Sequence, residues 1–219
     1  MSRVLPYNAK QWEIPAILDG RKTVIRRICK DVNELTVPDM SFYDADKRTY
    51  AVHNYADKEH TEKLSIAERR CPICPGDILY VRETWSHDVG GCYIHRASYK
   101  EDFTENTDID AVGNKIKWHP SIHMPKEAAR LWLKVTDVRV ERLNDMTVED
   151  AVKEGVSLDG IVTNQGIIEY RLWNRWEEIW NSTCKEEWQK DNPWVWVIEF
   201  ERCEKPEQWK GEKDGKRII

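Results

Sequence analysis

The sequence predicts an α+β protein built around a mostly antiparallel sheet or barrel. Three apolar runs, residues 78–85, 129–143 and 194–200, have the alternating or continuous pattern typical of strands. Helical spacing is limited to a few short stretches, and turn residues such as Pro75-Gly76-Asp77 separate the strands. Eleven tryptophans among 219 residues add large apolar side chains that favour burial. Several strands and few helices are therefore expected.

The first part of the chain begins with a helix and a strand. Ile14, Ile17 and Leu18 follow helical spacing, and Asp19-Gly20 ends this helix because glycine accepts a left-handed conformation. Residues 23–28 are β-branched and apolar enough for a strand. Residues 30–70 are polar and lack a clear period, so we expect a long polar insertion with one short helix near 62–69.

The remainder alternates strands with helices. Residues 93–99 predict a strand, and residues 100–116 predict a second polar insertion. A helix is expected after Thr147, where Asp150 completes a capping box and Gly155 closes the helix. A longer helix over 168–180 is predicted by bulky residues at helical spacing, namely Leu172, Trp173, Trp176, Ile179 and Trp180. No linker divides the chain, so we expect one domain over 1–203 and a charged tail over 204–219.

The charge distribution limits the classes of partner. The net charge is −5, yet residues 1–30 carry seven cations against two acids. A local basic patch on an acidic protein suits a small anionic site better than a long duplex track. No apolar stretch is long enough to span a bilayer, so we expect no membrane partner. The oligomeric state stays open.

The cysteines and the N-terminus bear on compartment and metals. The start of the chain lacks the apolar core of a signal peptide, which favours a cytoplasmic protein with six reduced thiols. Cys71 and Cys74 have the spacing of half a zinc site, but the sequence offers no second pair of ligands. We therefore expect two ordinary thiols, no metal and no cofactor.

The densest chemical feature is the segment that joins the first helix to the first strand. Arg21, Lys22, Arg26 and Arg27 follow Gly20 within seven positions. Arginine offers a planar fork to phosphate or a carbonyl edge, and lysine offers a point charge. One interpretation is a binding site for an anion or a polar base edge. The other is a set of solvated charges that protect a strand edge from aggregation.

The spacing Gly20-x-Lys22-x-x-x-x-Arg27 resembles the signature of the ASCH-domain family, which belongs to the PUA-like barrels. The segment 75–85 resembles a strand motif of the family, and the segments 118–125 and 192–200 are similar to parts of the longer form found in phages and prophages. The resemblance covers most of the chain, from about Leu5 to Arg202. It implies a PUA-like β-barrel with peripheral helices and long polar insertions.

The resemblance also implies function. RNA or modified-nucleoside binding is the usual proposal for the family, and one branch consists of amidohydrolases that deacylate N4-acetylcytidine. Carried over to this chain, the catalytic lysine is Lys22 and the catalytic glutamate is Glu154. The family's catalytic threonine position is Ile25 here, and an aliphatic side chain can neither attack nor share a proton. Thr23 lies two positions away, on the same strand face as residue 25.

Three further residues are candidate ligand contacts. Trp85 ends a strand beside Arg82 and is our candidate for base stacking, although burial is the ordinary role of a tryptophan. His123 lies in a proline-bounded segment and is a candidate donor. We rank an RNA or modified-nucleoside binder first, an amidohydrolase second, and a phage assembly or accessory protein without a ligand site third.

Overall fold

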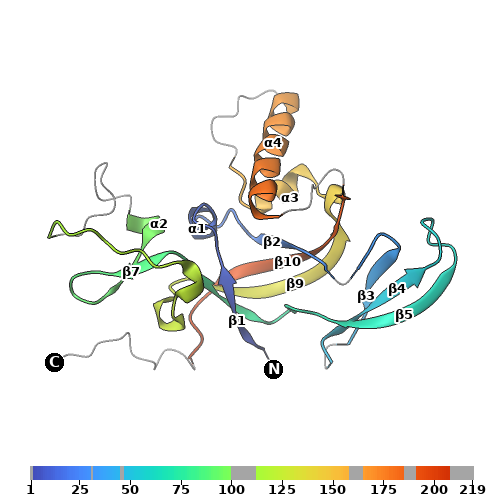
Figure 1. Cartoon of the computed structure of the whole chain (residues 1–219), viewed down its shortest axis with the longest axis horizontal. Helices are drawn as coiled ribbons and strands as arrows, with labels where there is room; N and C mark the ends of the chain where they lie inside the picture. Colours follow the sequence, from blue (N-terminus) through green and yellow to red (C-terminus); the bar gives the residue numbers. More distant parts are fainter. Residues whose placement is uncertain are drawn as a thin grey trace. The chain divides into compact units, whose positions relative to one another are not determined.

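The computed structural model describes residues 2–30, 32–44, 47–99, 112–157, 165–184 and 191–207. Strands dominate and helices are few, which confirms the expected α+β class (Figure 1). The chain forms two compact units. The first comprises residues 1–20, 76–134 and 201–219, and the second comprises 21–75 and 135–200. Most of the expected second insertion, residues 100–111, and the tail from residue 208 lie outside the described residues.

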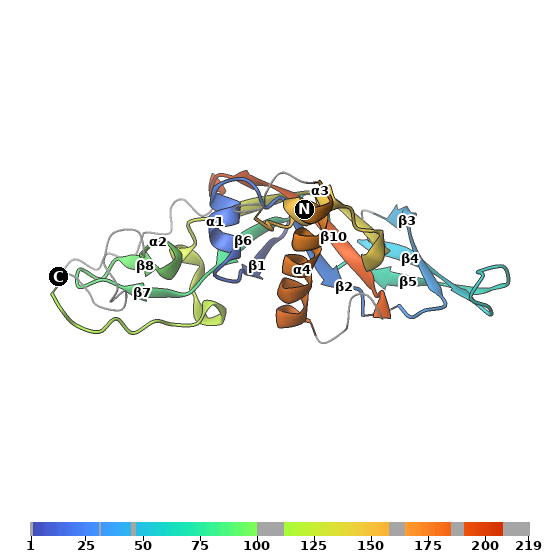
Figure 2. The same cartoon turned by 90° about the horizontal axis from the view of Figure 1, so that it is seen from above.

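The first unit is organised around β6 (Ile78–Arg82). β1 (Val4–Asn8) pairs parallel with β6, and the start of β9 (Trp132–Arg142) pairs antiparallel with it. β7 (Trp85–His87) and β8 (Tyr93–His95) form a hairpin that continues into α2 (Arg96–Tyr99), as Figure 2 shows. The other helices are α1 (Glu13–Leu18), η1 (Ser121–His123) and η2 (Lys126–Ala128). Its core includes Trp85, Met124, Ala128, Ala129 and Trp132.

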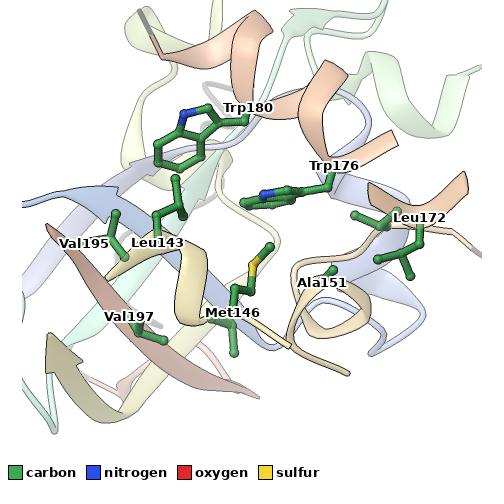
Figure 3. Close-up of a cluster of buried hydrophobic side chains, with 10 residues drawn as sticks. Leu143, Met146, Ala151, Leu172, Trp176, Trp180, Val195 and Val197 are labelled. Carbon is green, nitrogen blue, oxygen red and sulfur yellow. The ribbon is translucent and has the colours of Figure 1, made fainter. Parts of the chain in front are cut away.

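The second unit holds β2 (Val24–Ile28) and most of β9 and β10 (Trp194–Cys203). β10 pairs antiparallel with β2, which sets Val197 opposite Arg26. η3 (Leu143–Asp145), α3 (Val148–Lys153) and α4 (Gln165–Thr183) follow β9. Figure 3 shows Trp176 and Trp180 of α4 packed with Val195, Val197 and Leu143 in one buried cluster. One face of β10 is therefore covered by α4.

The expectation for residues 30–70 is wrong. They form a meander of β3 (Thr36–Asp44), β4 (Thr49–Tyr55) and β5 (Lys63–Arg70), and the expected helix near 62–69 is β5. Tyr50 and Val52 of β4 are buried, whereas almost all of β5 is exposed. A strand at the edge of a sheet with both faces in solvent has no apolar alternation, which is why the pattern was misleading.

Other elements agree with expectation apart from their ends. The capping box of Thr147 and Asp150 is present at α3, and α4 contains the predicted helix 168–180. The predicted strand 93–99 divides into β8 and α2, and β1 was not predicted. The strand orders are β1-β6-β9 in the first unit, β9-β10-β2 in the second, and β3-β4-β5 and β7-β8 in the smaller sheets. Within the described chain none of these sheets closes into a barrel.

Candidate functional site

The signature segment, residues 20–27, begins where α1 ends. The backbone N–H of Asp19 donates to Pro15, and Gly20 then takes a φ of +75°. A side chain at that φ is strained, so glycine suits the turn out of the helix. The next residues lead into β2 of the second unit, and their side chains meet two different environments.

Lys22 is buried, with 2% of its surface exposed. Its Nζ donates to the carboxylate Oε2 of Glu154 at 2.8 Å and to the backbone carbonyl of the same residue at 2.8 Å. Glu154 follows the last turn of α3, and Gly155 reverses the chain with a φ of +95°. The backbone N–H of Thr23 donates to Lys153 at 2.8 Å. The structure thus joins two residues that are 132 positions apart.

Arg26 extends this contact into a network. Its side chain is completely buried, with Nη1 3.3 Å from Glu154 and Nη2 2.8 Å from Glu141 and 3.6 Å from Asp150. Lys22, Arg26, Glu141, Asp150 and Glu154 together are the ion-pair network. Both carboxylate oxygens of Glu154 therefore have cationic partners. Burying these charges is tolerable because they pair with one another.

Asp150 and Arg139 connect the network to helix α3 and to the sheet. Burial disfavours the charge of Asp150, but hydrogen bonds from Thr147 and the nearby Arg26 outweigh burial and lower its pKa. Arg139 of β9 contacts Glu141 at 3.2 Å and Glu199 of β10 at 2.5 Å. Burial opposes the charge of Arg139 as well, but these two carboxylates raise its pKa. The network therefore links β2, β9 and α3, and Arg139 connects it to β10.

The other two cations of the signature segment face solvent. Arg21 and Arg27 are exposed. Nη1 of Arg21 lies 3.4 Å from the carbonyl of Gly155, beside the ion-pair network. Arg27 is opposite Trp196 in the register of β2 and β10, on the strand face that Arg26 does not share. The four expected cations are thus two buried ones with acidic partners and two at the surface.

Ile25 is buried and pairs in register with Ile198. Neighbouring strand residues point to opposite faces, so the side chain of Ile25 leaves β2 on the face away from Arg26. Thr23 is partly buried, and its backbone binds both Lys153 and Phe200. The hydroxyl-bearing position of the family signature is therefore occupied by an aliphatic side chain that packs in the sheet.

The remaining candidates belong to the first unit. Arg82 donates to the carbonyl of Ile122 at 2.7 Å, which holds η1 against β6. His123 is exposed within η1. Trp85 is 9% exposed, and the ring of His119 stacks on it at a centroid distance of 4.9 Å. The rings that surround Trp85 are more accessible than Trp85 itself.

Sequence reasoning missed several charged partners. Glu141 was not singled out, although charged residues alternate along the second half of β9, and Asp150 was expected only as part of a helix cap. In the first unit, Glu83 is buried and both its oxygens accept from Arg130, at 2.8 and 2.9 Å. His95 lies nearby, and its pKa is lowered by burial. No local pattern marks such pairs, because their partners are distant in sequence.

The cysteines are all thiols. Cys71 and Cys74 are buried, and their sulfurs donate to the carbonyls of Ile73 and Cys71. Burial and the neighbouring Cys74 raise the pKa of Cys71, which makes its thiol a poor nucleophile. Over the described ranges no group of three or more His, Cys, Asp or Glu is arranged for a metal ion.

The comparisons with known proteins assign no family. No family model and no curated protein matches the chain. A solved structure titled "Crystal structure of hypothetical protein PH0355" is similar at 16% identity and a TM-score of 0.36, over 91% of this chain and 99% of that one. Among the described helices, none has the length and apolar character needed to cross a membrane.

Proposed function

We propose that this chain is a binding module for RNA or a modified nucleoside, of ASCH type and related to the PUA-like folds, acting in the cytoplasm. The observation that supports this proposal is that the signature segment contains both buried and exposed cations. Lys22 and Arg26 are buried against carboxylates, whereas Arg21 and Arg27 face solvent. The ion-pair network holds the segment in place, and the guanidinium groups of Arg21 and Arg27 lie at the surface, where an anionic ligand can reach them.

The chemistry of the exposed groups suits this role. A guanidinium donates two parallel hydrogen bonds to phosphate or to a carbonyl edge of a base. A local pair of cations on a protein of net charge −5 favours a short or single-nucleoside ligand, because long nucleic acid is repelled by the rest of the surface. Binding should weaken as the salt concentration rises, because dissolved ions screen the attraction between exposed guanidinium groups and an anionic ligand.

The test is an equilibrium titration with a labelled single-stranded RNA, preceded by mass spectrometry of whatever nucleic acid or nucleoside co-purifies. The double variant Arg21→Ala/Arg27→Ala should lose affinity by about tenfold or more, because each charge-assisted contact contributes about 1.5–3 kcal/mol. Lys134→Ala, at an exposed cation of the first unit, is the matched control. If no nucleic acid or nucleoside co-purifies and the labelled RNA does not bind, an accessory protein without a ligand site is favoured.

A second candidate function is deacylation of an N4-acylated cytidine-like nucleoside. The contact between Lys22 and Glu154 favours it, because the family resemblance assigns proton handling to these two residues. Ile25 disfavours it, since the position expected to carry a hydroxyl has none. Release of acetate from N4-acetylcytidine by the wild type, abolished in Glu154→Gln, would reverse the ranking.

A further inference from the structure

The β7–β8 hairpin of the first unit carries a rigid group of aromatic rings. Trp85 and His119 are joined by two backbone hydrogen bonds, of 2.8 and 3.2 Å, although 119 lies outside the hairpin. The hydroxyl of Ser86 donates to the carbonyl of Lys117 at 2.9 Å. These bonds hold residues 117–119 beside β7 through one isolated bridge. The backbone that carries Trp118 and His119 is therefore positioned by the fold.

The rings surround Trp85 and are more accessible than it. His119 stacks on Trp85 at 4.9 Å, and Tyr93 lies 5.7 Å from it. His87 is opposite Tyr93 in the hairpin register, with ring centroids 4.8 Å apart, and His87 is exposed. Tyr93, His119 and the adjoining Trp118 are partly exposed. We call His87, Tyr93, Trp118 and His119 the aromatic surface.

Cations border the aromatic surface. The guanidinium of Arg96 lies 5.6 Å from the ring centre of Trp118, and Lys115 and Lys117 are exposed beside it in the chain. The acid of the hairpin turn, Asp88, accepts from the backbone of Gly90 and Cys92, so its charge is partly compensated. Rings together with cations are the two components with which proteins hold single-stranded nucleic acid.

We propose that the aromatic surface binds the bases of a single-stranded RNA, with Lys115, Lys117 and Arg96 beside its phosphates. This inference rests on the proposed function and concerns a site within the first unit alone. Base stacking needs rings that reach the solvent, and His87 is exposed and Tyr93 partly exposed, whereas Trp85 is buried. Because the rings are already ordered, binding costs little side-chain entropy. Duplex RNA should bind more weakly, since its bases are already stacked on one another.

The experiment is fluorescence anisotropy with a labelled oligouridine of about ten nucleotides. His87→Ala/Tyr93→Ala should weaken binding by about tenfold or more, the size expected when a stacked base loses its ring. His87→Phe/Tyr93→Phe keeps both rings and should stay within about threefold of the wild type. His87→Ala alone, at an exposed position, keeps the test informative should the double variant not fold, and circular dichroism verifies each variant.

The outcomes separate this inference from the proposed function. Should Arg21→Ala/Arg27→Ala lose affinity while His87→Ala binds as the wild type does, the aromatic surface is overturned and the binding module stands. A wild type that binds no single strand overturns the aromatic surface, and only the further absence of binding to any modified nucleoside overturns the proposed function as well. Equal affinity for duplex and single strand also overturns stacking. Equal binding of oligothymidine supports the surface and extends it from RNA to single-stranded DNA.

Discussion

The second unit and the first unit differ in which side chains they bury. The ion-pair network of the second unit buries charged side chains, whereas the aromatic surface of the first unit exposes rings. In the network, Lys22 and Arg26 are buried and their charges meet Glu141, Asp150 and Glu154. On the aromatic surface, rings that could have been core lie partly in solvent. The first arrangement holds strands and a helix together, and the second leaves rings partly exposed to the solvent.

The same contrast occurs inside the signature segment. Arg21 and Lys22 are neighbours, yet one is exposed and the other is 2% exposed. One cluster of cations therefore contains residues that are paired inside the fold and residues at the surface, which we call scaffold residues and contact residues. Lys22 differs from Arg21 because its ammonium group lies against Glu154. Substitutions among the scaffold residues should therefore destabilise the fold more than substitutions at the surface.

Removing the central carboxylate should have the largest effect. Glu154→Ala leaves Lys22 and Arg26 buried without their shared partner, and such a loss costs about 3–5 kcal/mol of unfolding free energy. Glu201→Ala is the control, because its contact with Lys134, at 3.8 Å, is exposed and contributes about 0–1 kcal/mol. Urea unfolding measures both. Equal small losses would show that the network does not stabilise the fold.

Asp150→Asn tests the rim of the network and its pH dependence. The loss should be about 1 kcal/mol at neutral pH, because the variant weakens a helix cap and an ionic contact. The folded-state pKa of Asp150 is lowered, so its stabilisation is complete above the ordinary value of 3.8 and is lost as pH falls through the lower folded value. The stability gap between wild type and variant, followed by urea unfolding, should therefore close in acid. A constant gap would contradict the ionic contribution.

Part of this division could be predicted from the sequence and part could not. The α3 cap, the α4 helix and the strand 194–200 were predicted from local sequence patterns, and the structure confirms all three predictions. The meander of β3, β4 and β5 was missed because β5 is exposed and alternates only at Leu64 and Ile66. The pairing of β9 with β6 and of β10 with β2 joins segments far apart in the chain, which local spacing does not encode.

The candidate site shows the same limit. A family resemblance pointed to Lys22 and Glu154, and the structure places them in contact. Nothing local indicated that Arg26 shares Glu154 or that Glu141 and Asp150 complete the network. Alternation along β2 does explain why Arg26 and Arg27 separate, but assigning the buried face required knowing what covers it.

The exposed rings should contribute little to stability. His87→Ala should change the unfolding free energy by no more than about 0.5 kcal/mol, because substitutions at exposed positions rarely do more. Trp176→Ala, in the buried cluster of Figure 3, should cost about 3–5 kcal/mol and serves as the positive control. Thermal and urea unfolding provide the comparison. A large loss in His87→Ala would make the aromatic surface part of the core.

Ile25→Thr is expected to have the smallest effect on chemistry. The new hydroxyl would lie beside Ile198, on the strand face away from Arg26, so it should not join Lys22 and Glu154. Acetate release from N4-acetylcytidine should stay at the level of buffer. A clear gain of turnover in this variant would show that residue 25 reaches the ion-pair network and would favour the deacylase.

The most direct test of the central claim is the RNA affinity of Glu154→Gln, measured at a temperature where circular dichroism shows the variant folded. Glutamine keeps the shape of the side chain and removes its charge, so the network is weakened while the surface of the protein is unchanged. We expect a dissociation constant within about threefold of the wild type, because Lys22 can still donate to the glutamine oxygen and to the backbone carbonyl of residue 154, and the side chain does not contact the ligand. A loss as large as that of Arg21→Ala/Arg27→Ala would place Glu154 in the ligand site and contradict the division between scaffold and contact residues.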